Sequence, residues 1–150
     1  MQGTGEYYLI SHLVLLTGLT DRTIRNHITS GVLKGEKING IWHFSPDTVE
    51  RFLRHPFVRQ SLAARRQVVV SDYLMDDRKK SCRVCMIVDF PDADKKKLAE
   101  YFFYRIANEK LPNVYFLPDS ISAVPRAILT GDADTVMMLV RDFRLHAETA

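Results

Sequence analysis

The stretch TDRTIRNHITSGVLKGEKINGIWHFS (residues 20–45) decides the fold of the N-terminal half of the chain. Thr20 precedes a helical pattern, and a threonine hydroxyl at that position accepts a hydrogen bond from a backbone N–H of the first turn. Ile24 and Ile28 recur at helical spacing and form one apolar stripe. Gly31 can adopt the positive φ that often follows a helix. The stretch therefore begins with a capped helix that ends at Gly31.

A shorter helix is predicted upstream, in YYLISHLVLLTGL (residues 7–19). Its apolar residues follow amphipathic helical spacing, and they are Ile10, Leu13, Val14 and Leu16. Gly18 ends this helix, because glycine adopts the required backbone conformation at low cost. Two helices joined by such a short glycine-containing turn make a helix-turn-helix.

A β-hairpin is predicted next, because Asn39-Gly40 lies between Ile38 and Ile41. This dipeptide is the strongest short-range signal for a two-residue turn with positive φ at both positions. Strand alternation puts Trp42 and Phe44 on one face, where we expect them to pack on the helices. Ser45, Pro46 and Asp47 then open a third helix with an apolar side of Val49, Phe52 and Leu53.

Residues 8–54 resemble the winged helix-turn-helix of the MerR and phage-excisionase superfamily. The resemblance lies in LTDRTIRNHITSGVL, in the hairpin KINGIWHFS and in the following PDTVERFL. It implies that the second helix enters the DNA major groove and that the hairpin, the wing, contacts phosphates. The hairpin end IWHFS is closer to the excisionase-type branch.

Candidate DNA-binding residues lie on the second helix, the hairpin and the third helix. Arginine can grip guanine and asparagine can grip adenine through two hydrogen bonds, while other basic side chains neutralise phosphates. One alternative is an ordinary solvated helix face, and another is that Arg25 pairs with a carboxylate such as Asp21. The candidates are Thr20, Arg22, Thr23, Arg25, Asn26, Thr29, Lys34, Lys37, His43, Arg51 and Arg54.

The distribution of charge favours a polyanionic partner for the N-terminal half. Residues 1–66 carry nine Lys or Arg and five Asp or Glu, so their net charge is 9 − 5 = +4. Residues 67–150 carry twelve and thirteen, so their net charge is 12 − 13 = −1. Such an asymmetry is typical of a chain in which one part meets nucleic acid.

The rest of the chain is expected to form a linker helix and a small α+β domain. Residues 56–80 form the helix, although the β-branched QVVV (residues 67–70) leaves a strand as the alternative. The C-terminal pattern is βαββα, with two helices covering one face of the sheet. Its segments are a strand at 83–90, a helix from Asp92 or Asp94 to Lys110, strands at 113–117 and 126–130, and a helix at 132–143 for which a strand is the alternative. The predicted division is thus 1–55, 56–80 and 81–150.

The sequence offers no motif for catalysis, a metal or a cofactor, so we expect none of these. Its five histidines show no ligand spacing, and positions 82 and 85, the only two cysteines, would point to opposite faces of a strand. Two Asp-Ala-Asp triplets, at 92–94 and 132–134, precede predicted helices, where acids are favoured as caps. No apolar run approaches a membrane span. A cytoplasmic protein that is not an enzyme is the expectation.

The function predicted from these patterns is sequence-specific binding to double-stranded DNA by a homodimeric transcriptional regulator. The aromatic segment YFFYRI (residues 101–106) could present a face to a second subunit or belong wholly to the core. Three other functions remain open, of which one is an architectural role in DNA like that of the excisionases. The C-terminal domain could bind a small-molecule effector, or the helix-turn-helix could act as an adaptor that docks a protein in place of DNA.

Overall fold

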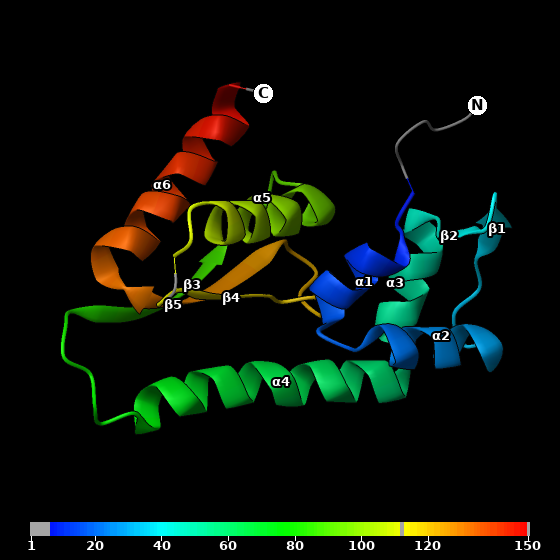
Figure 1. Ribbon diagram of the computed structural model, residues 1–150, viewed down its shortest axis with the longest axis horizontal. Coiled ribbons are helices and arrows are strands. Elements are labelled where there is room, and N and C mark those ends of the chain that lie inside the picture. The colour runs from blue at the N-terminus through cyan, green and yellow to red at the C-terminus, as the bar shows by residue number, and fades with distance from the viewer. Residues whose placement is uncertain (1–6, 112, 150) are drawn as a thin grey trace. The chain divides into compact units, whose positions relative to one another are not determined.

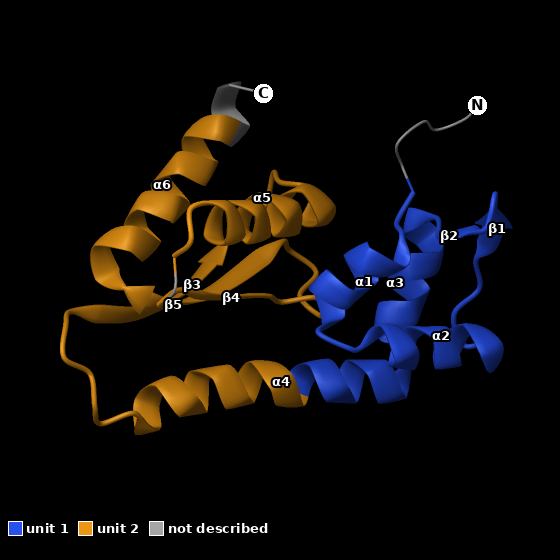
Figure 2. Ribbon diagram, viewed as in Figure 1, with its two compact units in different colours: residues 1–63 blue, residues 64–150 orange. Residues whose placement is uncertain are grey.

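The computed structural model describes residues 7–111 and 113–149 and has the mixed α+β architecture expected from the sequence (Figure 1). The chain divides into two compact units, residues 1–63 and residues 64–150 (Figure 2). The boundary lies inside one helix, α4 (Pro56–Met75). In the part of the chain that the model describes, no helix combines the length and apolar character needed to cross a membrane.

The first unit contains helices and a hairpin in the order predicted. Its elements are α1 (Ile10–Thr17), α2 (Asp21–Thr29), β1 (Glu36–Ile38), β2 (Ile41–His43), α3 (Pro46–Arg54) and the first part of α4. Gly18 has φ of 73° after α1, and the Thr20 hydroxyl accepts from the Thr23 N–H at the start of α2. Ser45 caps α3 through the Thr48 N–H. These local signals were predicted correctly.

The hairpin has the turn that the Asn39-Gly40 dipeptide requires. Asn39 has φ of 51° and Gly40 has φ of 80°, so both central residues are left-handed. The strands pair in antiparallel register, with Ile38 opposite Ile41. A bridge between Tyr8 and Phe44 continues the pairing beyond β2.

The core of the first unit is built from residues of the two helices, the hairpin end and α3. The largest fully buried side chains there are Leu13, Ile24, Leu33, Phe44 and Phe52. Ile28 is only half-buried, so the buried stripe expected for Ile24 and Ile28 is complete only at Ile24, and Trp42 is half-buried as well. The Trp42 ring stacks on Phe44, with 6.4 Å between the ring centroids.

A close approach at Gly35 accounts for the glycine before β1. A Cβ atom at this position would lie 2.4 Å from Cε1 of Phe44. Because real Cβ atoms do not come so close to a buried ring, only glycine lets the chain pass over Phe44.

The second unit contains the rest of α4 and a βαββα arrangement. Its elements are β3 (Arg83–Asp89), α5 (Lys95–Asn108), β4 (Tyr115–Pro118), β5 (Arg126–Asp132) and α6 (Ala133–Thr149). Residues 67–70 are helical within α4 and residues 133–143 are helical within α6, so both strand alternatives are wrong. The helix predicted to reach residue 80 ends at Met75.

The three-stranded antiparallel sheet has the order β3-β5-β4. Helices α5 and α6 cover one face, as predicted (Figure 1). Phe116 of β4 contacts the rings of Phe102 and Phe103 on α5, at centroid distances of 5.0 and 4.9 Å. Phe143 of α6 packs on Phe90 at 4.9 Å. Phe102 and Phe103 of the segment 101–106 therefore belong to this aromatic core, whereas Tyr104 is 67% exposed.

The opposite face of the sheet lies against the C-terminal part of α4, which was not predicted. The Tyr73 hydroxyl donates to the Arg83 carbonyl at 3.1 Å, and Arg65 donates to the Tyr115 hydroxyl at 3.2 Å. The sheet is thus a middle layer, with α4 on one side and α5 and α6 on the other (Figure 2).

Candidate nucleic-acid interface

Helix α2 carries an exposed polar stripe formed by Arg22 and Asn26. The two residues are four apart, so their side chains lie one above the other on the same face. Both are exposed, whereas Ile24 is completely buried on the core side. Within residues 7–111 and 113–149, neither the guanidinium of Arg22 nor the carboxamide of Asn26 has a hydrogen-bond or ion-pair partner. This pair of side chains is therefore available to an external ligand.

The threonines of the predicted set serve the helix itself. The Thr20 hydroxyl caps the first turn at 3.1 Å from the Thr23 backbone nitrogen and also bonds the Thr23 hydroxyl at 2.9 Å. The Thr29 hydroxyl donates to the Arg25 carbonyl at 3.1 Å. Thr20, Thr23 and Thr29 are thus positioned to hold α2 in shape, and any contact they make with a ligand would compete with these bonds.

Arg25 differs from Arg22 because it is paired within the helix. Its Nε lies 2.6 Å from Oδ1 of Asp21, one turn earlier, and both side chains are largely exposed. The alternative weighed from the sequence, in which Arg25 pairs with Asp21, is confirmed. The pair cancels one positive charge on the face of α2 beside Arg22.

The two basic residues of α3 are paired in the same way. Arg51 contacts Asp47 at 3.4 Å, and Arg54 contacts Glu50 at 3.8 Å. All four side chains are exposed, and such pairs contribute little to stability. They do, however, leave α3 with little net positive charge to offer a phosphate.

The segment that follows α2 adds positive charge that has no carboxylate partner among the described residues. Lys34 and Lys37 are both exposed, and the Lys37 ammonium lies 5.8 Å from the centre of the Trp42 ring. His43 is half-buried, with Nδ1 3.0 Å from the Ile41 carbonyl oxygen and its ring edge-on to Tyr7. The two lysine ammonium groups are therefore open to an anionic ligand, whereas His43 contributes mainly to the packing of the hairpin.

His27 faces the interior of the first unit. Its ring lies 5.3 Å from the buried ring of Phe52. Burial, with a smaller contribution from the charge of His55, lowers the pKa of His27 below its ordinary value of 6.5. The imidazole is therefore neutral near pH 7 and adds no charge to the polar stripe.

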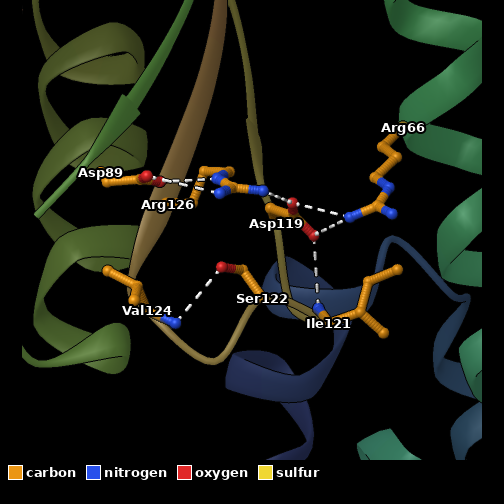
Figure 3. A network of polar contacts seen from close by, with 7 residues as sticks. All are labelled: Arg66, Asp89, Asp119, Ile121, Ser122, Val124 and Arg126. Atoms are coloured by element: carbon orange, nitrogen blue, oxygen red, sulfur yellow. Dashed lines mark hydrogen bonds and ion pairs between the residues drawn. The ribbon is translucent and has the colours of Figure 1, made fainter. Parts of the chain in front are cut away.

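A cluster of charged residues in the second unit was not identified from the sequence (Figure 3). The Asp119 carboxylate is 2% exposed and accepts from Arg66 at 3.0 Å and from Arg126 at 3.3 Å. Arg126 also grips Asp89, with Nε 2.6 Å from Oδ1, which lowers the pKa of Asp89. The two positive charges of the arginines are offset by the two negative charges of the aspartates. We therefore interpret the cluster as a structural link between α4, β3 and β5. No sequence spacing joins residues so far apart in the chain.

The cysteines and acidic triplets have structural explanations. Cys82 and Cys85 are free thiols, and burial raises the pKa of Cys85. Asp94 caps α5, and Asp132 accepts from the Thr135 N–H at the start of α6. Among the described residues, no three His, Cys, Asp or Glu side chains gather closely enough to hold a metal ion.

A candidate site for a small-molecule effector is a hollow of about 620 Å³ in the second unit. It lies beside Met86 and Val88 of β3 and Val140 and Phe143 of α6. Its charged lining residues, such as Arg144, are exposed at the surface. Ligand sites combine an apolar lining with polar groups that are fixed inside the cavity, and the charged residues of this hollow lie at its surface instead. Effector binding therefore stays a prediction.

Comparisons with known proteins yield no relative for this chain: no family model, no curated protein and no solved structure matches it. The assignment of a function therefore depends on the residues of the two units themselves.

Proposed function

We propose that the protein is a sequence-specific regulator of transcription that binds double-stranded DNA as a homodimer, with residues 8–54 acting as a winged helix-turn-helix. The observation that carries this proposal is the Arg22–Asn26 stripe on α2. Arginine and asparagine are the residue types that pair bidentately with guanine O6 and N7 and with adenine N6 and N7. Here both are exposed, aligned on one helix face and without a partner in the described part of the chain.

The contrast between Arg22 and the other arginines supports this choice. Arg25, Arg51 and Arg54 each pair with a carboxylate one turn away on their own helix. Arg22 has Gly18 four residues before it and Asn26 four residues after it, so no carboxylate stands one turn away and its charge is left open to a ligand. An α-helix with its side chains is about 10–12 Å in diameter, so α2 can enter the major groove, which is roughly 12 Å wide.

The hairpin supplies the second contact in the proposal. Lys34 and Lys37 carry charge next to α2 without a carboxylate partner in the described residues, so they suit the phosphate backbone. Phosphate contacts fix the register of a protein on the duplex, while base contacts read its sequence. In this arrangement Arg22 and Asn26 read bases and the two lysines hold the backbone.

A homodimer is part of the proposal because one such module contacts few base pairs. Regulators of this kind gain specificity by placing two copies on two half-sites about one helical turn apart. The expected target is therefore an inverted repeat.

Selection from a pool of random duplexes by the full chain tests the proposal. We expect enrichment of one motif, arranged as two inverted half-sites that contain guanine and adenine. Affinity for this motif, followed by fluorescence anisotropy, should fall steeply as salt is raised, because bound counterions are released. A pool that stays random, together with equal affinity for unrelated duplexes, would contradict sequence-specific binding. Complete absence of DNA binding would favour the adaptor function.

A further inference from the structure

Strand β3 forms one edge of the sheet in the second unit. The strand order is β3-β5-β4, so only β5 pairs with β3 among the described residues. At seven residues, β3 is one of the two longest strands. An edge of this length presents a row of backbone donors and acceptors that can pair with another chain.

The backbone groups that face outward can be identified from the ladder. The Ala133 N–H donates to the Cys82 carbonyl at 3.0 Å, and the Phe90 N–H donates to the Pro125 carbonyl at 2.8 Å. Hydrogen-bonded residues alternate along an antiparallel strand, so the even-numbered residues of β3 bond β5. The residues whose N–H and C=O point away from β5 are Arg83, Cys85, Ile87 and Asp89.

The other edge of the sheet is closed to pairing by its sequence. The Asp119 N–H donates to the Arg126 carbonyl, so the odd-numbered residues of β4 bond β5. Phe116 and Pro118 are the β4 residues that face outward, and proline has no N–H to donate. With four residues and one outward N–H, β4 is a poor template.

The β3 edge has an apolar border on both faces of the sheet. On the α4 side, Ile87 is 56% exposed and Leu74 is 71% exposed, and together they line a hollow of about 470 Å³. On the α6 side, Met86 and Val88 line the hollow of about 620 Å³. Natural edge strands are usually protected by lysine, proline or a covering element, and β3 has neither residue in its sequence.

We propose that β3 pairs antiparallel with β3 of a second copy of this chain, with Met86 at the two-fold axis. This register places outward-facing residues opposite each other: Cys85 faces Ile87 of the second copy, and Arg83 faces Asp89 of the second copy. Each such pair exchanges two backbone hydrogen bonds. The Arg83 carbonyl already accepts from the Tyr73 hydroxyl, so at the end pairs it accepts the second bond with its remaining lone pair. The two end pairs bring opposite charges together, and each Asp89 carboxylate, which Arg126 of its own copy already contacts, then lies between two arginines. The strand is therefore complementary to itself in charge as well as in hydrogen bonding.

Pairing in this way continues the sheet across the axis and covers Ile87. It supplies the interface for the homodimer, and in this respect the inference rests on the proposed function. The interface itself needs no DNA, so it can be tested separately.

The first test is the mass of the full chain in solution, measured by light scattering after gel filtration. The parent chain should be a dimer and Ile87→Lys a monomer, because the variant places a charge at the centre of the interface. Met137→Lys is the matched control, since it adds the same charge at an exposed apolar residue of α6, 49% exposed against 56% for Ile87. A monomeric parent, or a dimeric Ile87→Lys that melts like the parent, would overturn the proposal.

The second test is disulfide cross-linking in a Cys82→Ser, Cys85→Ser background. Met86→Cys should form a covalent dimer on mild oxidation, because its copy lies opposite in a non-hydrogen-bonded pair, with about 4.5 Å between Cα atoms. Val88→Cys should stay uncross-linked. In this register it faces Val84, so its own copy lies four residues away, at about 14 Å. Equal cross-linking of both variants, or none, would rule out the register.

The outcomes also separate the two proposals. A cross-linked dimer that binds every duplex equally would keep the interface and remove the regulator function. A monomer that selects one DNA motif would do the reverse.

Discussion

Replacement of Arg22 by alanine is the substitution with the largest expected effect on DNA binding. A good bidentate contact to a base contributes about 1–3 kcal/mol of discrimination. In a homodimer the side chain is lost from both half-sites, so the expected cost is about 2–6 kcal/mol. At about 1.4 kcal/mol for each factor of ten, affinity for the selected duplex should fall by about 30-fold or more.

The loss should appear in binding and not in folding. Arg22 is exposed and has no partner in the described residues, so its removal should change the free energy of unfolding by less than about 0.5 kcal/mol. Thermal unfolding followed by circular dichroism should therefore match that of the parent.

Arg54→Ala is the matched control for the loss of one positive charge. Arg54 is exposed in the same unit, but it pairs with Glu50 at 3.8 Å. We expect this variant to weaken binding by less than about 10-fold, and by the same factor on every duplex. Arg22→Lys should retain affinity for random duplexes while it loses preference for the selected one, because lysine keeps the charge but not the planar fork.

Fluorescence anisotropy on the selected duplex and on one scrambled at the enriched guanine measures both quantities. If Arg22→Ala and Arg54→Ala weaken binding equally on both duplexes, Arg22 contributes only charge, and the assignment of α2 as the reading helix is refuted.

Four further outcomes are expected. Lys34→Ala should lower affinity uniformly across sequences and, because the lysine is lost from both half-sites, reduce the slope of log affinity against log salt by about 2. Burial lowers the pKa of His27, so the folded chain resists protonation of this side chain. The free energy of unfolding measured in urea should therefore be constant above pH 6.5 and fall as the pH drops below that value. The fall should be smaller in His27→Phe. Asp119→Ala leaves two arginines without their buried partner, and it should lower the free energy of unfolding by an amount near the lower end of about 3–5 kcal/mol because those arginines are partly exposed. An unchanged urea midpoint would show that the cluster does not stabilise the fold. Trp42→Ala should cost about 1–2 kcal/mol, since the half-buried ring stacks on Phe44, and a melting curve equal to that of the parent would contradict this packing.

Local features of the fold were predictable because their causes lie within a few residues of one another. The Thr20 and Ser45 caps, the Asn39-Gly40 turn and the glycine after α1 each follow from the conformation or hydrogen bond that one residue type supplies. Helical spacing also outweighed β-branched composition in residues 67–70, where the chain continues α4.

Features that depend on contacts between distant residues were not predictable. Asp119 meets Arg66 across 53 positions of sequence, and no pattern in one chain joins them. The requirement for glycine at position 35 arises only when Phe44 folds under it. Likewise, α4 was expected as a linker, and its contact with the sheet depends on Tyr73 reaching the Arg83 carbonyl.

The candidate site was chosen from the sequence as a set of residues, and its binding of DNA stays a prediction. The sequence places Arg22 and Arg25 equally well on the polar side of α2. The carboxylate of Asp21 distinguishes them, because it lies 2.6 Å from Arg25 in the folded chain. The spacing of four residues between Asp21 and Arg25 already offered this pair as an alternative, and the folded chain confirms it.

The most direct test of DNA recognition by α2 is a titration of the ¹⁵N-labelled full chain with the selected duplex, followed residue by residue by nuclear magnetic resonance. The largest shifts are expected at the backbone amides of residues 21–29 and at the Asn26 side-chain amide, with smaller shifts at residues 34–43. Shifts confined to residues 64–149, with α2 unchanged at saturation, would contradict the account.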